Sequence, residues 1–98
     1  MAIESFKNKP TERIGGGEVS KQTRKLLSAE LHQKAQIKLA VLGAGTSIED
    51  LRDLRGNRFE ALKGNRKGQF SIRINDQYRI CFEWREGNAF NVEIVNYH

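Results

Sequence analysis

Alternation of apolar and polar residues is clearest in the stretch Gln69-Phe-Ser-Ile-Arg-Ile-Asn-Asp-Gln-Tyr-Arg-Ile-Cys-Phe-Glu-Trp84. A period of two is typical of strands that bury one face. The polar run at 75–77 predicts a turn, so the two halves should pair as an antiparallel hairpin. Because both strands must keep their apolar faces together, we expect Arg73 and Arg79 opposite or diagonal to each other on the other face.

The residues on either side of this hairpin continue the pattern. A shorter strand is expected over residues 58–62, before a turn at 63–68. After a turn at 85–88, Phe90, Val92 and Ile94 alternate with Asn91, Glu93 and Val95, which predicts a last strand with the first three in the core. The connections are short, so the sheet is expected to be an antiparallel meander.

Helical spacing dominates the first half of the chain. Ser28 is a plausible N-cap, and Gly43 or Gly45 would end the helix. A short helical segment should follow over residues 46–54, whereas residues 21–26 could belong to the long helix or to an earlier one. Helices followed by strands predict an α+β fold with the helices packed on one face of the sheet. The predicted buried stripe of the long helix comprises Leu27, Leu31, Ala35, Leu39 and Leu42, widened by Ile37 and Val41.

The N-terminal residues carry weaker signals. Residues 2–6 alternate weakly and could form a short strand. A helical turn is expected at 10–13, because Pro10 suits the first helical position. The three glycines at 15–17 predict a mobile loop, since glycine loses the most backbone entropy on ordering.

Composition limits the class of protein. The 98 residues predict a single domain spanning 1–98, and the net charge of +5 is typical of a nucleic-acid binder. Cys81 is the one cysteine, so no internal disulfide is expected; with only His32 and His98 beside it, a Cys/His zinc site is not expected either. The sequence offers neither a long apolar run nor a signal-peptide pattern, and we expect a cytoplasmic protein without a membrane partner.

Positive charge is concentrated in one segment: six basic and two acidic residues lie between Arg58 and Arg79. An anion between Arg73 and Arg79 would relieve their repulsion, and phosphate suits guanidinium forks. The alternative is that these arginines are simply solvated, and that the glycine-flanked turn carries ordinary surface charge. At the C-terminus, Tyr97 and His98 could pack on the sheet edge, or they could supply an aromatic platform and a titratable group.

These motifs together resemble one toxin family. The motifs Leu-Lys-Gly-x-Arg-x-Gly at 62–68, Ile-Arg-x-Asn-x-Gln-Tyr-Arg at 72–79 and the final Tyr-His are similar to the HigB branch of the RelE/ParE toxin superfamily. The likeness is dense over residues 56–98 and loose before them. It implies a RelE-like compact fold resembling microbial ribonucleases. It also implies an endoribonuclease of a type II toxin–antitoxin system that cleaves mRNA in the decoding site of the translating ribosome, without metal or cofactor.

The same resemblance implies roles for single residues. Lys63, Arg73 and Arg79 fall where the family has its basic catalytic or phosphate-stabilising residues, and Tyr97 and His98 fall on its C-terminal active-site pair. Glu60 stands where some members have histidine, so either Glu60 or His98 could be the general base. Five further basic residues are expected to bind RNA, the first two by docking on ribosomal RNA: Lys34, Lys38, Arg58, Arg66 and Lys67.

Partners follow from the resemblance as well. It implies a small helix-turn-helix antitoxin, with operator DNA bound only by the toxin–antitoxin complex. Two other functions stay open at this point. One is a ParE-like toxin acting on DNA gyrase, and the other is a non-catalytic basic RNA-binding domain. The Tyr97–His98 pair beside the paired arginines would be needed by a nuclease and not by either alternative.

Overall fold

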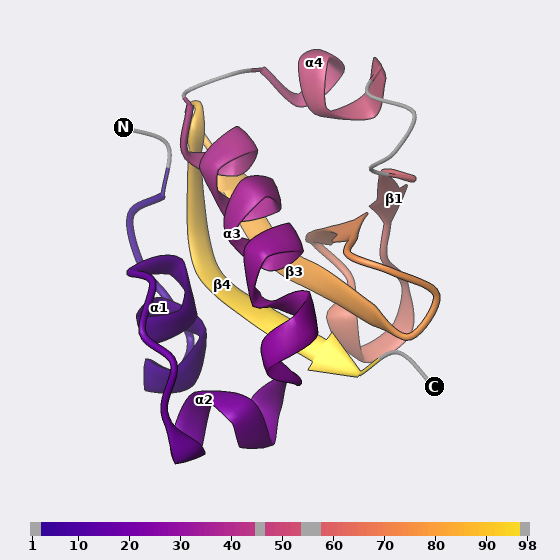
Figure 1. Cartoon of the computed structure of the whole chain (residues 1–98). Helices are drawn as coiled ribbons and strands as arrows, with labels where there is room; N and C mark the ends of the chain where they lie inside the picture. Colours follow the sequence, from indigo (N-terminus) through magenta and orange to yellow (C-terminus); the bar gives the residue numbers. More distant parts are fainter. Residues whose placement is uncertain (1–2, 45–46, 54–57, 97–98) are drawn as a thin grey trace.

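Helices precede strands along the chain, and the strands form one antiparallel sheet in the order β1-β2-β3-β4 (Figure 1). The structure is a computed structural model that describes residues 3–44, 47–53 and 58–96. This arrangement confirms the predicted α+β class and the meander. The elements are α1 (Lys9–Gly15), α2 (Lys21–Leu26), α3 (Ala29–Gly43), α4 (Ile48–Asp53), β1 (Glu60–Ala61), the 3₁₀ turn η2 (Gly64–Arg66), β2 (Gln69–Arg73), β3 (Tyr78–Arg85) and β4 (Asn88–Asn96).

Two tight turns set the register of the sheet. Asn75 closes the β2–β3 turn, because its side-chain oxygen accepts from the backbone N–H groups of Gln77 and Tyr78 at 2.9 and 2.8 Å. Glu86 and Gly87 both have positive φ, 52° and 83°, as a two-residue turn between twisted strands requires. The predicted hairpins are therefore confirmed.

The first helices are separated by local capping. Ser20 and Thr23 form a reciprocal capping box at the start of α2, and Leu27 then adopts an extended conformation that ends this helix. Residues 21–26 are therefore a helix of their own. Ser28 is the N-cap residue of α3 as predicted, although its side chain makes no capping bond. His32, which is buried, donates from Nε2 to the Leu27 carbonyl at 2.7 Å and so ties α3 to the end of α2.

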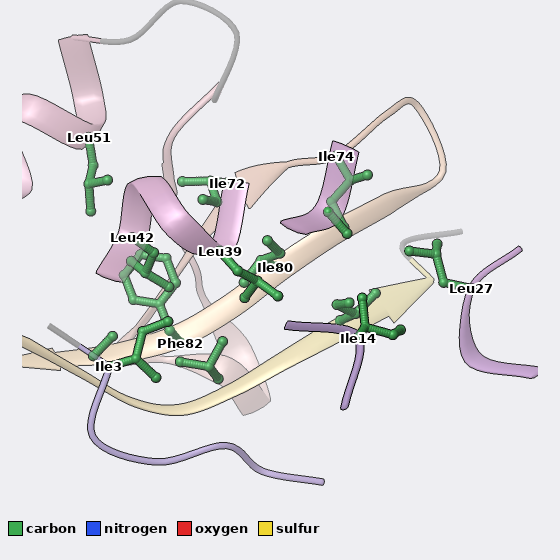
Figure 2. Close-up of a cluster of buried hydrophobic side chains, with 14 residues drawn as sticks. Ile3, Ile14, Leu27, Leu39, Leu42, Leu51, Ile72, Ile74, Ile80 and Phe82 are labelled. Carbon is green, nitrogen blue, oxygen red and sulfur yellow. The ribbon is translucent and has the colours of Figure 1, made fainter. Parts of the chain in front are cut away.

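The core lies between α3 and one face of the sheet. In Figure 2, Leu39 and Leu42 of α3 lie over Ile80 and Phe82 of β3, and Leu51 of α4 closes one end. These residues are at most 4% exposed, so burial of apolar surface is the main term holding the helix on the sheet. The opposite face of the sheet carries the polar residues of β2 and β3.

Two predicted core residues are placed differently. Ile37 is 56% exposed, because it lies outside the buried stripe of α3. This stripe consists of His32, Ala35, Leu39 and Leu42. Phe90 is not in the core stripe. Asn91, with φ of 53°, is an extra residue in β4, and this bulge reverses the alternation so that Phe90 pairs with Glu83.

The N-terminal segment covers the outer edge of β4. Ile3 and Phe6 form parallel bridges to Ala89 and Val92, so the described residues 3–6 make isolated bridges and not the full strand expected over residues 2–6. Thr11 of α1 accepts the Ile94 N–H at 3.2 Å. These contacts satisfy backbone groups that an open edge would leave exposed. The three glycines predicted to form a loop make a tight turn at the end of α1. Gly15 is the last residue of this helix, and Gly17 has a positive φ of 89°.

Helix α4 is capped reciprocally as well. The N–H of Asp50 donates to Ser47 Oγ at 3.1 Å, and the Ser47 N–H donates to the Asp50 carboxylate at 3.4 Å. Leu51 is buried as predicted. Thr46 and Leu54, which were also expected to belong to this segment, lie outside the described residues.

Candidate nucleic-acid site on the open face of the sheet

Arg73 and Arg79 are direct partners across β2 and β3, which confirms the predicted pairing. The next row of the same face runs from Glu60 through Ser71 and Cys81 to Glu93. Like charges that face each other across a ladder repel, so their placement is unfavourable unless something else holds it. The register of β2 and β3 thus places Arg73 and Arg79 side by side at the hairpin despite their repulsion.

The Arg79 side chain is held by two oxygen atoms. Its Nε–H donates to Ser71 Oγ at 2.8 Å, and its Nη2 donates to the Arg58 carbonyl. Ser71 is fully buried. Arg58 has φ of 42°, a left-handed conformation that costs a non-glycine residue about 1–2 kcal/mol. Both neighbours are neutral acceptors, so these bonds orient the guanidinium without cancelling its charge.

Arg73, unlike Arg79, contacts an acidic side chain in the structure. Its Nη2 contacts the Asp76 carboxylate within the β2–β3 turn. The Asp76 side chain is 96% exposed, so the pair is screened by water and contributes little to stability. A phosphate could replace this exposed carboxylate at low cost.

Helix α3 brings a third cation to the hairpin. The pKa of Lys38 is lowered below its ordinary value, chiefly by partial burial and then by the positive charges of Lys34 and Arg73. The sequence predicts only that Lys34 and Lys38 dock on ribosomal RNA. The charge of Arg73 thus reaches Lys38, although α3 packs on the core face of the sheet.

Arg66, which is predicted to bind RNA, forms contacts within the protein. Its Nη1 donates to the Glu93 carboxylate at 2.9 Å and to the Gln69 side-chain oxygen at 3.0 Å. Lys7 lies 3.6 Å from the same Glu93 oxygen, and the Glu93 side chain is only 14% exposed. These contacts tie the 63–68 turn and the N-terminal segment to β4.

The other predicted site residues surround this face. Glu60 is exposed and is the β1 partner of Ser71, which bonds Arg79. Lys63 and Lys67 are exposed at the two ends of η2, and Arg58 is exposed just before β1. The C-terminal pair Tyr97 and His98 lies outside the described residues.

Two contributors were missed by the sequence analysis. Ser71 shares the strand parity of Arg73, so its place on this face could have been read from the alternation. The Arg58 carbonyl left no sequence signal, because a backbone oxygen is present at every residue and only the positive φ aims it at Arg79.

Cys81 lies under the same face and is fully buried. Burial raises the pKa of its thiol above the ordinary value, with Glu93 adding to the rise and the cations Arg66 and Arg79 opposing it. The thiol is therefore protonated at neutral pH and behaves as a small packing group.

Two kinds of feature are absent from residues 3–44, 47–53 and 58–96. No group of three or more histidine, cysteine, aspartate or glutamate side chains converges there. Among the same residues, no helix has the length and apolar character needed to cross a membrane.

A protein of known structure shares the fold of this chain. Over its whole length, the chain matches the YoeB–YefM complex from Staphylococcus aureus with a TM-score of 0.53 and 14% identity, covering 99% of the matched chain. At this identity the likeness concerns the fold alone. It agrees with the α+β arrangement expected of a RelE-like toxin.

Sequence comparison gives the family. The model of the RelE-like toxin of type II toxin–antitoxin systems, HigB, matches residues 4–98. Toxin HigB-1 of Vibrio cholerae serotype O1 is 41% identical over 91 residues, which cover 93% of this chain and 92% of that protein. An uncharacterized protein of Haemophilus influenzae is 29% identical over 70 residues, or 71% of this chain and 69% of that protein. The chain belongs to the HigB-like family of RelE-type toxins.

Proposed function

We propose that this toxin is a ribosome-dependent endoribonuclease that cleaves mRNA in the decoding site and thereby stops translation and growth. The observation that carries the proposal is the direct pairing of Arg73 and Arg79 on the open sheet face. Two guanidinium groups at one point of the surface suit a phosphodiester whose negative charge increases in the transition state. Because translating ribosomes are in the cytoplasm, the proposal also places the toxin there.

Cleavage by this route needs three functions. The ribose 2′-OH must lose a proton as it attacks the adjacent phosphorus, the extra charge on the phosphate must be stabilised, and the leaving 5′-oxygen must gain a proton. In our proposal Arg79 and Arg73 stabilise the phosphate, with Lys63 adding positive charge. Glu60 or His98 takes the first proton, protonated His98 is the better donor of the second, and Tyr97 stacks on or orients a base. No metal or cofactor takes part in this scheme.

Binding of the ribosome would use the surrounding positive charge. Lys34 and Lys38 extend the basic region onto α3, and the exposed side chains of Arg58 and Lys67 lie beside the sheet. Arg66, already ion-paired with Glu93, would contribute less than these. Phosphate contacts of this kind are sequence-independent and weaken steeply with salt.

The partner we propose is a helix-turn-helix antitoxin. Two findings support an antitoxin: the family consists of toxins of type II toxin–antitoxin systems, and the fold relative was solved as a complex named for both components. In this proposal operator DNA is bound only through the toxin–antitoxin complex. The positive charge of this toxin suits a partner with an acidic surface.

The test is to add the purified toxin to mRNA, free or on translating ribosomes, and to map breaks by primer extension. We expect breaks at the decoding-site codon that need the ribosome, and at least a 100-fold lower rate for Arg79→Ala, about the effect of losing a preorganised donor. Circular dichroism confirms that the variant is folded. Intact mRNA with a folded wild-type toxin that still arrests growth would contradict the proposal and favour gyrase or non-catalytic RNA binding.

A further inference from the structure

A buried hydroxyl group lies beneath the open face at the point where Arg79 crosses it. Ser71 is fully buried and is the direct cross-strand partner of Cys81, one position along β2 from Ile72 of the core. Its Oγ accepts the Nε–H of Arg79 at 2.8 Å. A polar side chain on a central strand needs a bonding partner when it is buried, and here the partner is the arginine itself.

The bond from Nε determines more than position. The Nε–H lies in the plane of the guanidinium group, so a fixed acceptor there limits rotation about the last side-chain torsions. The second contact, from Nη2 to the Arg58 carbonyl, fixes the same plane at another point. The left-handed conformation of Arg58 holds that carbonyl in place, and strained residues of this kind concentrate at functional sites.

We infer that Ser71 is a positioning residue that, together with the Arg58 carbonyl, holds the Arg79 guanidinium in the orientation needed to bind the scissile phosphate. This inference rests on the proposed nuclease function and deepens it. An arginine that is already oriented loses less side-chain entropy when the transition state forms. Ser71 itself does not touch the substrate, because its hydroxyl is covered by Arg79 and the sheet.

The effect should fall on the chemical step. Ser71→Ala removes the Nε acceptor and leaves the charge of Arg79 in place. We expect kcat for ribosome-dependent cleavage to fall about tenfold, the usual consequence of losing a hydrogen bond to a charged group, with KM changed less than about twofold. The matched control is Cys81→Ala, which removes one buried heavy atom from the neighbouring strand and should leave kcat within about twofold.

A second pair of variants separates positioning from general destabilisation. Arg79→Lys keeps the charge but has a carbon atom in place of Nε, so the Nε–H bond that fixes the plane of the guanidinium group is lost. In this background Ser71→Ala should cost less than about twofold, whereas an effect acting through stability would again cost about tenfold. Equal losses in both backgrounds would overturn the inference.

The orientation can also be measured without any RNA. In the full-length toxin, nitrogen-15 NMR of the arginine Nε–H groups should show slow solvent exchange for Arg79, lost in Ser71→Ala and retained in Cys81→Ala. If exchange at Arg79 is unchanged by Ser71→Ala, the positioning role is wrong whatever the enzyme does. If the NMR result is as expected but the wild type cleaves no mRNA, the proposed function fails and the inference about catalysis fails with it, while the Ser71–Arg79 bond stands.

Discussion

Arg66 and Arg79 come from the same basic segment and lie over the same sheet face, but they are held in different ways. Arg66 bonds to the Glu93 carboxylate and the Gln69 amide oxygen. Arg79 bonds to a serine hydroxyl and a backbone carbonyl. A carboxylate neutralises the charge it binds, whereas neutral oxygens only orient it. We therefore propose that Arg66 has a structural role and that Arg79, in the orientation these bonds give it, binds phosphate.

The strongest test of this contrast replaces each arginine by methionine. Arg79→Met should lower the single-turnover rate of mRNA cleavage on ribosomes by about 10²–10³-fold, since a donor aimed at developing charge is lost. Arg66→Met should change that rate by less than about tenfold and instead lower the free energy of unfolding by about 1–3 kcal/mol. Cleavage assays and urea unfolding of both variants measure these opposite effects on rate and stability. A loss of cleavage in Arg66→Met at unchanged stability would assign Arg66 to RNA binding after all.

The Glu93 side of the comparison can be tested by its own pair. Glu93→Gln removes the countercharge of Arg66 and Lys7 from a side chain that is only 14% exposed, and should cost about 1–2 kcal/mol of stability. Glu12→Gln is the control, because the Lys9–Glu12 pair is exposed and should change stability by less than about 0.5 kcal/mol. Thermal and urea unfolding give both values. Equal effects of the two changes would mean that the Glu93 contacts are no stronger than a surface pair.

A smaller effect is expected on α3. Lys34→Gln and Lys38→Gln should each weaken ribosome binding several-fold and lower the slope of log affinity against log salt by about 0.7–1, as expected when one phosphate contact is lost. Lys25→Gln, an exposed lysine in the last turn of α2, should leave the slope unchanged. Binding measured from 50 to 200 mM salt separates them. An unchanged slope in both α3 variants would exclude this helix from the RNA surface.

The smallest effect concerns Cys81 between the two arginines. Burial raises the pKa of its thiol in the folded state, so the thiol ionises first in the unfolded chain. Its contribution to stability is therefore full below the ordinary thiol pKa and is lost as pH rises through the raised value. The stability difference between wild type and Cys81→Ala should shrink from pH 7 to pH 10 in urea unfolding. A difference that grows over this interval would mean that the folded protein favours the thiolate.

Much of the fold could be predicted because local patterns specify it. The alternation in β2 and β3, with a polar turn between them, required Arg73 and Arg79 to lie opposite or diagonal to each other, and the register pairs them directly. Phe90 shows where this reasoning fails. One extra residue at Asn91 reverses the alternation, and a bulge has no period of its own in the sequence. The prediction that Ile37 is buried also fails, because helical spacing does not show how wide a face of the helix the sheet covers.

The amino-acid sequence by itself determined the class of fold, the basic segment and the residues that strand parity brings to one face. These follow from periodicity and charge, which are properties of neighbours along the chain. Only the tertiary structure decided which arginine is neutralised by Glu93, which is oriented by Ser71 and the Arg58 carbonyl, and that Lys38 approaches Arg73 from another element. Those relations join residues far apart in the chain, and they depend on how α3 and the turns pack against the sheet.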